Sequence, residues 1–208
     1  CAGMTEFRGT GNAAITKASG TVHIPNVLME NMTGAGGATY TATGIDLGGN
    51  TGWSFSGTTP KDLYWIGGTG DWNDAANWTE HNDGTPSGGC IPTQYDNVFF
   101  NQYSGPNGIT VTIAETPAYA HDITWLPGAP ENATLTGTST LDLLNIHGSY
   151  TMGQNMTHSI ITHFLSDDAG ETITFNGSQI TGWYVVFDGG GGWQFQDDAF
   201  FMTVNVSV

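Results

Sequence analysis

Apolar and polar residues alternate in short runs along most of the chain. Ile109, Val111 and Ile113 alternate strictly with two threonines, which is the period of a strand with one buried and one solvated face. Similar runs recur at intervals of roughly 8 to 14 residues, with Gly, Asn and Asp between them. No window shows a sustained apolar period of about 3.6 residues. The pattern therefore predicts an all-β protein of many short strands, with threonine-rich outer faces.

The segments expected to be strands in the second half of the chain are 95–101, 109–113, 122–126, 134–136, 141–144, 149–152, 160–164, 173–175, 184–187, 193–195 and 200–208. Upstream, residues 1–20 are expected to form a short, irregular rung. A strand follows at 21–32, and Pro25 places it at an edge or a corner because proline cannot donate to a ladder. Residues 34–52 hold seven glycines and are interpreted as a long turn system.

Short strands at these intervals are compatible with a sandwich or with a solenoid. We favour the solenoid because the strands are very short and the turns do not resemble two-residue hairpins. Repeated short rungs can bury apolar residues by stacking on each other. The predicted fold is a right-handed parallel β-helix (β-solenoid), and the alternative is an antiparallel β-sandwich.

The segment 64–78 divides the chain. Four of the seven tryptophans lie at or just before it, at Trp53, Trp65, Trp72 and Trp78. Glycines and aspartates between them favour tight turns, and the indoles can bury large surfaces. We interpret the segment as a tryptophan-rich plug at a module boundary near Pro60. Residues 1–60 would be the C-terminal rungs of a preceding module, and residues 61–208 a second module that opens with the plug.

The tryptophan-rich plug and the segments that follow it resemble part of a known protein family. The plug contains Trp65-Ile-Gly-Gly-Thr-Gly-Asp-Trp72 and Ala75-Ala-Asn-Trp78, followed by Gly88-Gly-Cys-Ile-Pro-Thr93 and Asp96-Asn-Val-Phe-Phe100. This order resembles the module opening of giant tandem-repeat surface proteins of Bacteroidota, a group that includes gliding-motility adhesins and other cargo of type IX secretion. Further similar segments are Gly36-Gly-Ala-Thr-Tyr-Thr-Ala42, Asp46-Leu-Gly-Gly-Asn-Thr-Gly-Trp-Ser-Phe55 and Leu144-Asn-Ile-His-Gly-Ser-Tyr150.

The resemblance implies β-solenoid modules, export to the cell surface, and adhesion rather than turnover. It supplies no catalytic residues. Further copies of the module, in the same or a neighbouring chain, and a polysaccharide or cell surface are the expected partners. One departure concerns Cys90, because a second cysteine is expected near residues 120–125 and this chain has Ala120 there.

The charge of the chain limits its partners. Nineteen acidic residues against three basic ones give a net charge of −16, which disfavours nucleic acid and anionic lipid because both would be repelled. No apolar run approaches the roughly 20 residues that cross a bilayer, so membrane insertion is not expected. The acidic surface keeps an extracellular protein soluble, and its natural partner is a cation.

Calcium is the cation that the plug suggests. Asp71, Asn73 and Asp74 fall within four residues inside a glycine-containing turn, so several oxygens could converge on one hard ion. The competing interpretation is turn capping by the same side chains. No cofactor is required on either view.

Two other pairs of residues are candidates, one for a disulfide bond and one for sugar binding. Cys1 and Cys90 are the only cysteines and could form a disulfide, although Cys1 could also have lost its partner by truncation or carry a lipid. Trp183 and Trp193 are flanked by glycine and could be exposed platforms for a sugar, while tryptophans at strand spacing also serve as core residues.

Catalysis has weak support in the sequence. Asp167-Asp168 and Ile146-His147-Gly148 weakly resemble elements of solenoid glycosidases, but Arg8, Lys17 and Lys61 are the only basic residues, and none lies in the strand-rich second half. His158 and His163 lack the companions of a transition-metal site.

We therefore expect an extracellular, structural and adhesive module that is not an enzyme. The alternatives are a filament subunit joined through an uncapped edge at 204–208, or a polysaccharide-binding or polysaccharide-degrading β-helix protein.

Overall fold

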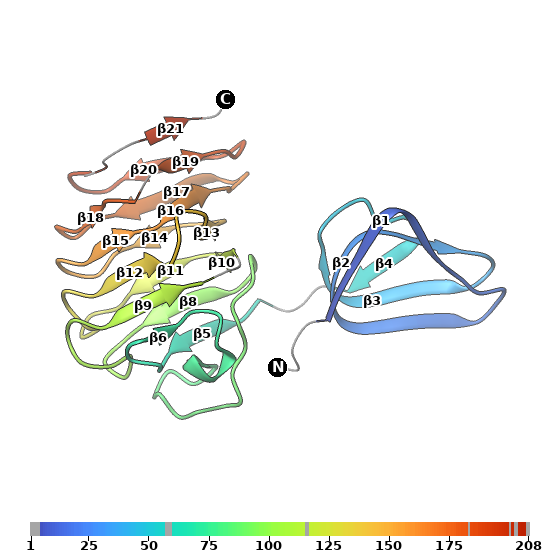
Figure 1. The fold of residues 1–208 in the computed structure, drawn as a ribbon, viewed down its shortest axis with the longest axis horizontal. Coiled ribbons are helices and arrows are strands. Elements are labelled where there is room, and N and C mark those ends of the chain that lie inside the picture. Colours follow the sequence, from blue (N-terminus) through green and yellow to red (C-terminus); the bar gives the residue numbers. More distant parts are fainter. Residues whose placement is uncertain are drawn as a thin grey trace. The chain divides into compact units, whose positions relative to one another are not determined.

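The computed structural model describes residues 5–56, 60–114, 117–182, 184–199, 201 and 204–206. It consists of two compact units, Cys1–Thr59 (unit 1) and Pro60–Val208 (unit 2), each drawn in Figure 1. The division lies one residue before the predicted one. The prediction of an all-β protein is confirmed, since the one described helix is a single 3₁₀ turn.

Unit 1 is one parallel sheet in the order β1-β2-β3-β4. The strands are β1 (Thr5–Thr16), β2 (Thr21–Ala35), β3 (Thr39–Asp46) and β4 (Trp53–Ser56). Its small core is formed by side chains of the sheet itself, Val27, Met29 and Met32 of β2 and Ala42 of β3.

Two predictions for unit 1 were wrong, and so was one of the two alternatives, an edge or a corner, given for the strand that contains Pro25. The irregular rung expected at 1–20 contains the twelve-residue strand β1, and the turn system expected at 34–52 contains the eight-residue strand β3. Pairing with β2 on both sides supplies ladder partners that the glycine-rich sequence does not reveal. β2 is therefore not at an edge, and a register shift between Ile24 and Val27 accommodates Pro25.

Unit 2 contains the remaining elements: β5 (Asp62–Trp65), β6 (Gly70–Asp71), η1 (Ala75–Asn77), β7 (Trp78–Thr79), β8 (Asn97–Phe100), β9 (Thr110–Ile113), β10 (Ala118–Ala120), β11 (Ile123–Trp125), β12 (Thr134–Gly137), β13 (Leu143–Ile146), β14 (Tyr150–Thr151), β15 (Thr157–Ser159), β16 (Ile161–Phe164), β17 (Ala169–Thr174), β18 (Gln179–Ile180), β19 (Val185–Phe187), β20 (Gly192–Phe195) and β21 (Val204–Val206).

These strands form three sheets, which we name after one member each. The β8 sheet has the order β20-β17-β14-β11-β8-β5-β7, the β9 sheet β18-β15-β12-β9-β6, and the β10 sheet β10-β13-β16-β19-β21. From β8 to β19 the chain visits the three sheets in a fixed rotation, and Figure 1 shows the resulting layers. All described strand pairs except β5 with β7 are parallel. This pairing is compatible with a β-helix and differs from the antiparallel sandwich that was the alternative.

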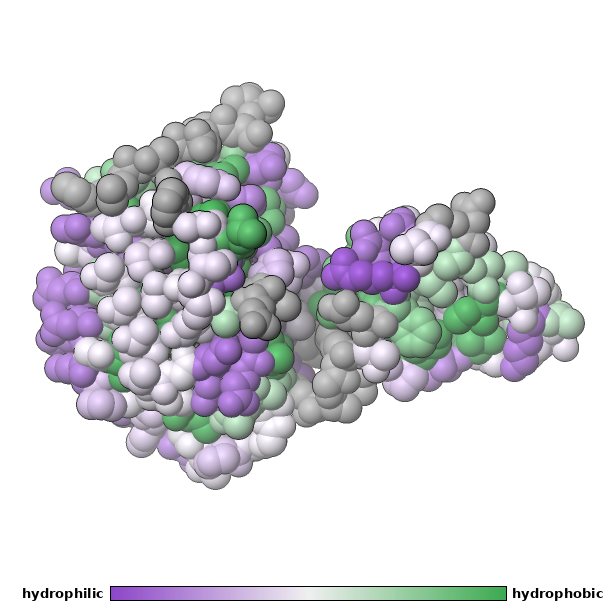
Figure 2. All heavy atoms as spheres, viewed as in Figure 1, coloured by the Kyte–Doolittle hydropathy of each residue, from purple (hydrophilic) through white to green (hydrophobic). Residues whose placement is uncertain are grey.

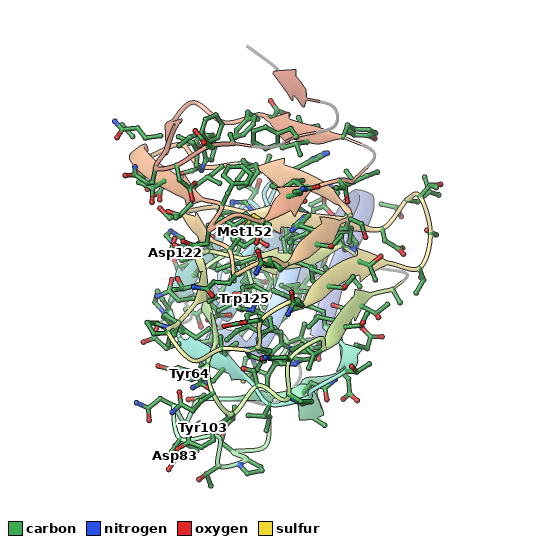
Figure 3. The ribbon with its side chains drawn as sticks, turned by 90° about the vertical axis from the view of Figure 1, so that its left-hand side faces the viewer. Tyr64, Asp83, Tyr103, Asp122, Trp125 and Met152 are labelled. Carbon is green, nitrogen blue, oxygen red and sulfur yellow. The ribbon has the colours of Figure 1, made fainter. Side chains whose placement is uncertain are left out.

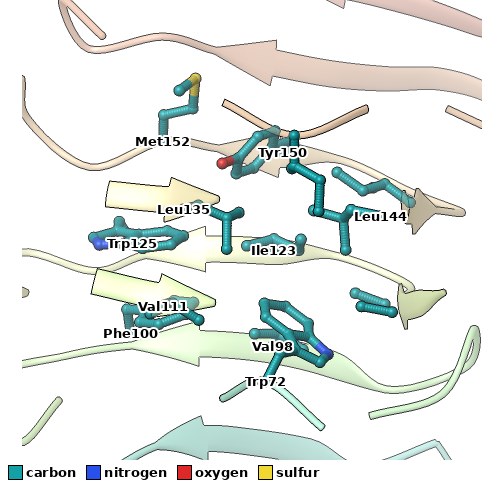
Figure 4. Packing of buried hydrophobic residues seen from close by; sticks show 14 of the residues in the cluster. Trp72, Val98, Phe100, Val111, Ile123, Trp125, Leu135, Leu144, Tyr150 and Met152 are labelled. Carbon is teal, nitrogen blue, oxygen red and sulfur yellow. The ribbon is translucent and has the colours of Figure 1, made fainter. Parts of the chain in front are cut away.

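Columns of apolar residues fill the interior of unit 2. In the β8 sheet, Leu63, Val98, Ile123, Tyr150 and Ile173 occupy matching positions on successive strands and are fully buried. Figure 4 shows members of this column facing the interior. Burial of each such side chain contributes roughly 1.5 to 3 kcal/mol, so the stack gains stability with every added strand.

Neighbouring columns complete this core. Phe100 and Trp125 stack with ring centroids 3.6 Å apart, and Figure 4 shows the pair beside Val111 and Leu135. In the β9 sheet, the residue that follows Val111 and Leu135 in the same column is His158, which is fully buried.

Asparagines mark a repeated turn between the β8 and β9 sheets. Asn132, Asn155 and Asn176 have φ values of 55°, 52° and 51°, a left-handed conformation that asparagine adopts more readily than most residues. The side-chain amide of Asn176 donates to the carbonyl of Met152 at 2.8 Å. The asparagines seen in the sequence therefore set the direction of the chain between two sheets.

Candidate functional site

The tryptophan-rich plug is a hydrophobic cap at the first end of unit 2. Trp65, Trp72 and Trp78 are buried, and Trp78 meets the other two edge to face at 5.0 and 4.9 Å. The Trp65 indole donates to the Gly68 carbonyl at 2.9 Å, and the Trp78 indole donates to the Trp72 carbonyl at 2.7 Å. Trp53 belongs to unit 1, where it packs on Tyr40, so three of the four tryptophans converge.

The three calcium candidates are engaged in turns. A carboxylate oxygen of Asp71 accepts the backbone N–H of Asn73, and one of Asp74 accepts the backbone N–H of Ala76 at the start of η1, both at 2.9 Å. The Asn73 side-chain amide donates to the Ala114 carbonyl at 3.3 Å. Across the described ranges, no three His, Cys, Asp or Glu side chains gather as a metal site would require. These contacts match turn capping, the competing interpretation.

Two of the four cysteine and sugar candidates lie outside the described residues. Cys90 is half-buried beside the main core, while Cys1 lies outside the described residues, as does Trp183. Trp193 is half-buried, and its indole donates to the Gly148 carbonyl at 3.1 Å. Its ring packs on Phe164 and Phe187, so it joins an aromatic cluster rather than standing alone on the surface.

His158 lies in a buried polar network. Its Nδ1 is 2.9 Å from the Tyr150 hydroxyl, its Nε2 is 2.5 Å from the Thr162 hydroxyl, and that hydroxyl donates to the Ile160 carbonyl. This assigns a neutral ring that donates from Nε2 and accepts at Nδ1. Burial lowers the pKa of His158 to about 3 and raises the pKa of Tyr150. The sequence favoured a surface or a packed position for His158 over metal binding, without deciding between the two, and its position between polar neighbours in 157–159 is a strand signal.

The other groups considered for catalysis lie apart from this network. Asp167 accepts the backbone N–H of Gly190 at 2.9 Å, which ties two loops together. Burial lowers the pKa of His163, and Asp188 opposes that shift. Burial also lowers the pKa of His147, with His121 acting in the same direction. We find no arrangement of a general acid and a base among these residues.

The outer side of the β9 sheet carries an ordered array of hydroxyl groups, which we call the threonine face. One column holds Thr110, Thr134 and Thr157 and continues with the amide side chain of Gln179, and the next holds Thr112, Thr136 and Ser159. The strands of this face pair without register shifts, so the hydroxyls repeat at about 4.8 Å across strands and roughly 6.8 Å along them. Such an array can hydrogen-bond a polar surface.

The outer side of the β8 sheet has a different composition. Tyr64 and Phe99 stack at 5.1 Å on adjacent strands, and the Asn97 amide donates to Asp62 at 3.0 Å. Figure 3 shows Tyr64 on the outside of the stack, whereas Trp125 lies within it. Each stacked ring covers one face of the other, so the two form a cross-strand aromatic pair.

The visible surface of unit 2 is mostly polar. In Figure 2, hydrophilic and near-neutral side chains cover most of it, and hydrophobic ones form small patches. In the part of the chain that the structure describes, no helix has the length and apolar character to cross a bilayer. Comparisons with protein-family models, curated proteins and solved structures give no match for this chain.

Proposed function

We propose that this chain is a structural and adhesive module of an extracellular protein, in which unit 2 is a right-handed parallel β-helix. Its task is to extend a surface protein and to present polar outer faces to a polysaccharide or cell surface. The observation that supports this most is the threonine face, a regular polar array backed by a buried column of Val111, Leu135, His158 and Ile180. The function needs no cofactor.

The use of the polar residues supports binding over turnover. Of the acidic and histidine side chains considered, Asp167 bridges two loops by accepting the Gly190 N–H, and His158 lies in the core. A polysaccharide offers many hydroxyls at regular intervals, and each good hydrogen bond to the threonine face would contribute about 1 kcal/mol. Several weak contacts along a repeating ligand give useful total affinity.

Binding of the full chain to insoluble polysaccharides and to a glycan array tests the proposal. We expect saturable binding without release of oligosaccharide. Replacing Thr134 and Thr136 by Val removes two hydroxyls but keeps strand-forming side chains, and should weaken binding about tenfold or more. The matched control is Thr124→Val with Thr151→Val on the β8 sheet, which should bind as before.

Three results would contradict the proposal. One is the absence of binding to any glycan surface. Another is an equal loss of binding in both double variants. The third is oligosaccharide release that disappears in Asp168→Asn, because this would make the protein an enzyme.

A further inference from the structure

The threonine face is more regular than the outer side of the neighbouring β10 sheet. Six of its residues lie in two columns on three adjacent strands, and we call them the hydroxyl array: Thr110, Thr134 and Thr157 in one column, and Thr112, Thr136 and Ser159 in the other. The outer column of the β10 sheet holds Tyr119, Asn145, His163 and Val186. That column changes in size and polarity at every strand, whereas the hydroxyl array repeats small hydroxyl side chains.

The strands beneath the hydroxyl array hold it in a fixed arrangement. Between its two columns lies the buried column of Val111, Leu135 and His158, and these strands pair without register shifts. Threonine is branched at Cβ and has a restricted χ1 angle, so its methyl and hydroxyl groups keep preferred directions. The Ser159 hydroxyl also donates to the Thr136 hydroxyl at 3.0 Å. A surface that is ordered in advance loses little conformational entropy when it binds.

The hydroxyl array is uncharged and open to hydrogen bonding. Its six positions hold no acidic or basic residue, although the chain has 19 acidic residues. The hydroxyls of Thr110, Thr112, Thr134 and Thr157 have no hydrogen-bond partner among the residues that the structure describes. The array ends at β6, where Asp71 is the partner of Thr112. These features match a ligand surface that is itself uncharged and rich in hydrogen-bonding groups.

The spacing of the hydroxyl array indicates a ligand that is regular in two directions. The hydroxyls repeat at about 4.8 Å across the strands and roughly 6.8 Å along them. A single polysaccharide chain repeats along one line only. On the prism faces of ice, water oxygens repeat in two perpendicular directions, and both repeats are close to those of the array. Water molecules held by the array would therefore already occupy positions of the ice lattice.

We propose that the hydroxyl array binds ice. Water molecules that accept from and donate to the threonine hydroxyls, beside the threonine methyl groups, join an ice crystal as part of its outermost layer. Hydrogen bonds through such waters are nearly as favourable as direct ones. Adsorbed chains force ice to grow as curved fronts between them, which lowers the temperature of crystal growth but not the melting temperature. The inference goes beyond the proposed function, because it assigns a second kind of ligand to the same face.

Adsorption of the full chain to ice tests the proposal. An ice hemisphere is grown slowly in a solution of the protein, and tryptophan absorbance measures the protein in the ice and in the remaining liquid. The gap between the melting and growth temperatures of single crystals is measured in parallel. We expect protein to enter the ice, crystals to become faceted, and the gap to widen with protein concentration. Exclusion of the parent chain from the ice, without such a gap, would overturn the proposal.

A pair of matched variants tests which face binds. Thr134→Lys places a long charged side chain at the centre of the hydroxyl array and should abolish both adsorption to ice and the temperature gap. Thr151→Lys makes the same change at an outward position on a central strand of the β8 sheet, and should behave like the parent. Circular dichroism and thermal unfolding establish that both variants are folded. Adsorption of Thr134→Lys at the parent's level, or equal losses in both variants, would overturn the proposal.

The two ligands of the threonine face can be separated by experiment. Binding to neutral polysaccharide is measured above the freezing point, where no ice is present. A chain that binds polysaccharide but is excluded from ice would overturn this inference and leave the proposed function standing. A chain that adsorbs to ice through the hydroxyl array but binds no polysaccharide would confirm this inference and remove polysaccharide as a ligand.

Discussion

Protonation of His158 should make the stability of unit 2 depend on pH. The ring is neutral and buried, held between Tyr150 and Thr162. A histidine in the unfolded chain titrates near 6.5, whereas burial lowers the pKa of His158 to about 3 in the folded protein. Between these values the unfolded chain binds a proton that the folded chain does not. Stability is therefore fully present above pH 6.5 and is lost as pH falls towards 3.

The size of this loss follows from linkage. Each pH unit below 6.5 costs about 1.4 kcal/mol, so the contribution at pH 5 is a loss of about 2 kcal/mol. Urea unfolding at pH 7 and pH 5, followed by tryptophan fluorescence, measures the difference. The His158→Gln variant has no group at this position that titrates between pH 5 and pH 7. Its loss of unfolding free energy between these pH values should therefore be smaller than that of the parent by about 2 kcal/mol. His81→Gln is the control because His81 is exposed.

Two observations would refute this reasoning. One is an identical pH dependence in the parent and in His158→Gln. The other does not require the variant to fold: an NMR titration in which every imidazole, including that of His158, titrates near its ordinary value would show that the ring is not buried.

The remaining predictions concern the cap, a loop and the calcium candidates. Trp72→Ala should lower the free energy of unfolding by roughly 3 to 5 kcal/mol in urea titrations, and a loss below 1 kcal/mol would show that the cap is not packed. Burial opposes ionisation of Asp142, but hydrogen bonds from Ser139 and Thr138 lower its pKa overall. Asp142→Ala leaves those donors unpaired and should lower the free energy of unfolding by roughly 1 to 3 kcal/mol. Calorimetry can measure this loss. Calcium should not raise the Tm of the parent more than that of Asp71→Asn, and a saturable rise in the parent alone would establish a metal site.

Much of the strand pattern of unit 2 could be predicted from the sequence. The alternation at 109–113 gives β9, and the segment 122–126 contains β11. The strands β10, β15 and β18 were missed because they are two or three residues long and none has more than one large apolar or aromatic side chain to show an alternation. They are strands because strands distant in sequence pair with them, β13 with β10, and β12 and β18 with β15, which no local pattern reveals.

The site was harder to predict than the fold. The turn that follows Asp71 was predicted, although Asp71 itself is the last residue of β6, and sequence spacing cannot show whether oxygens point at a common centre or at nearby N–H groups. The threonine face was visible only as a preference for threonine in outward positions. Its order across strands depends on register, which long-range pairing determines.

Stacking in a fixed register is the central claim, and distances between spin labels test it directly. Labels would be placed at Thr110 and, in separate double variants, at Thr134, Thr157 or Gln179, which lie in one column. The account predicts backbone separations that grow by about 4.8 Å with each strand. A set of distances without this regular increase, as two antiparallel layers would give, would contradict it.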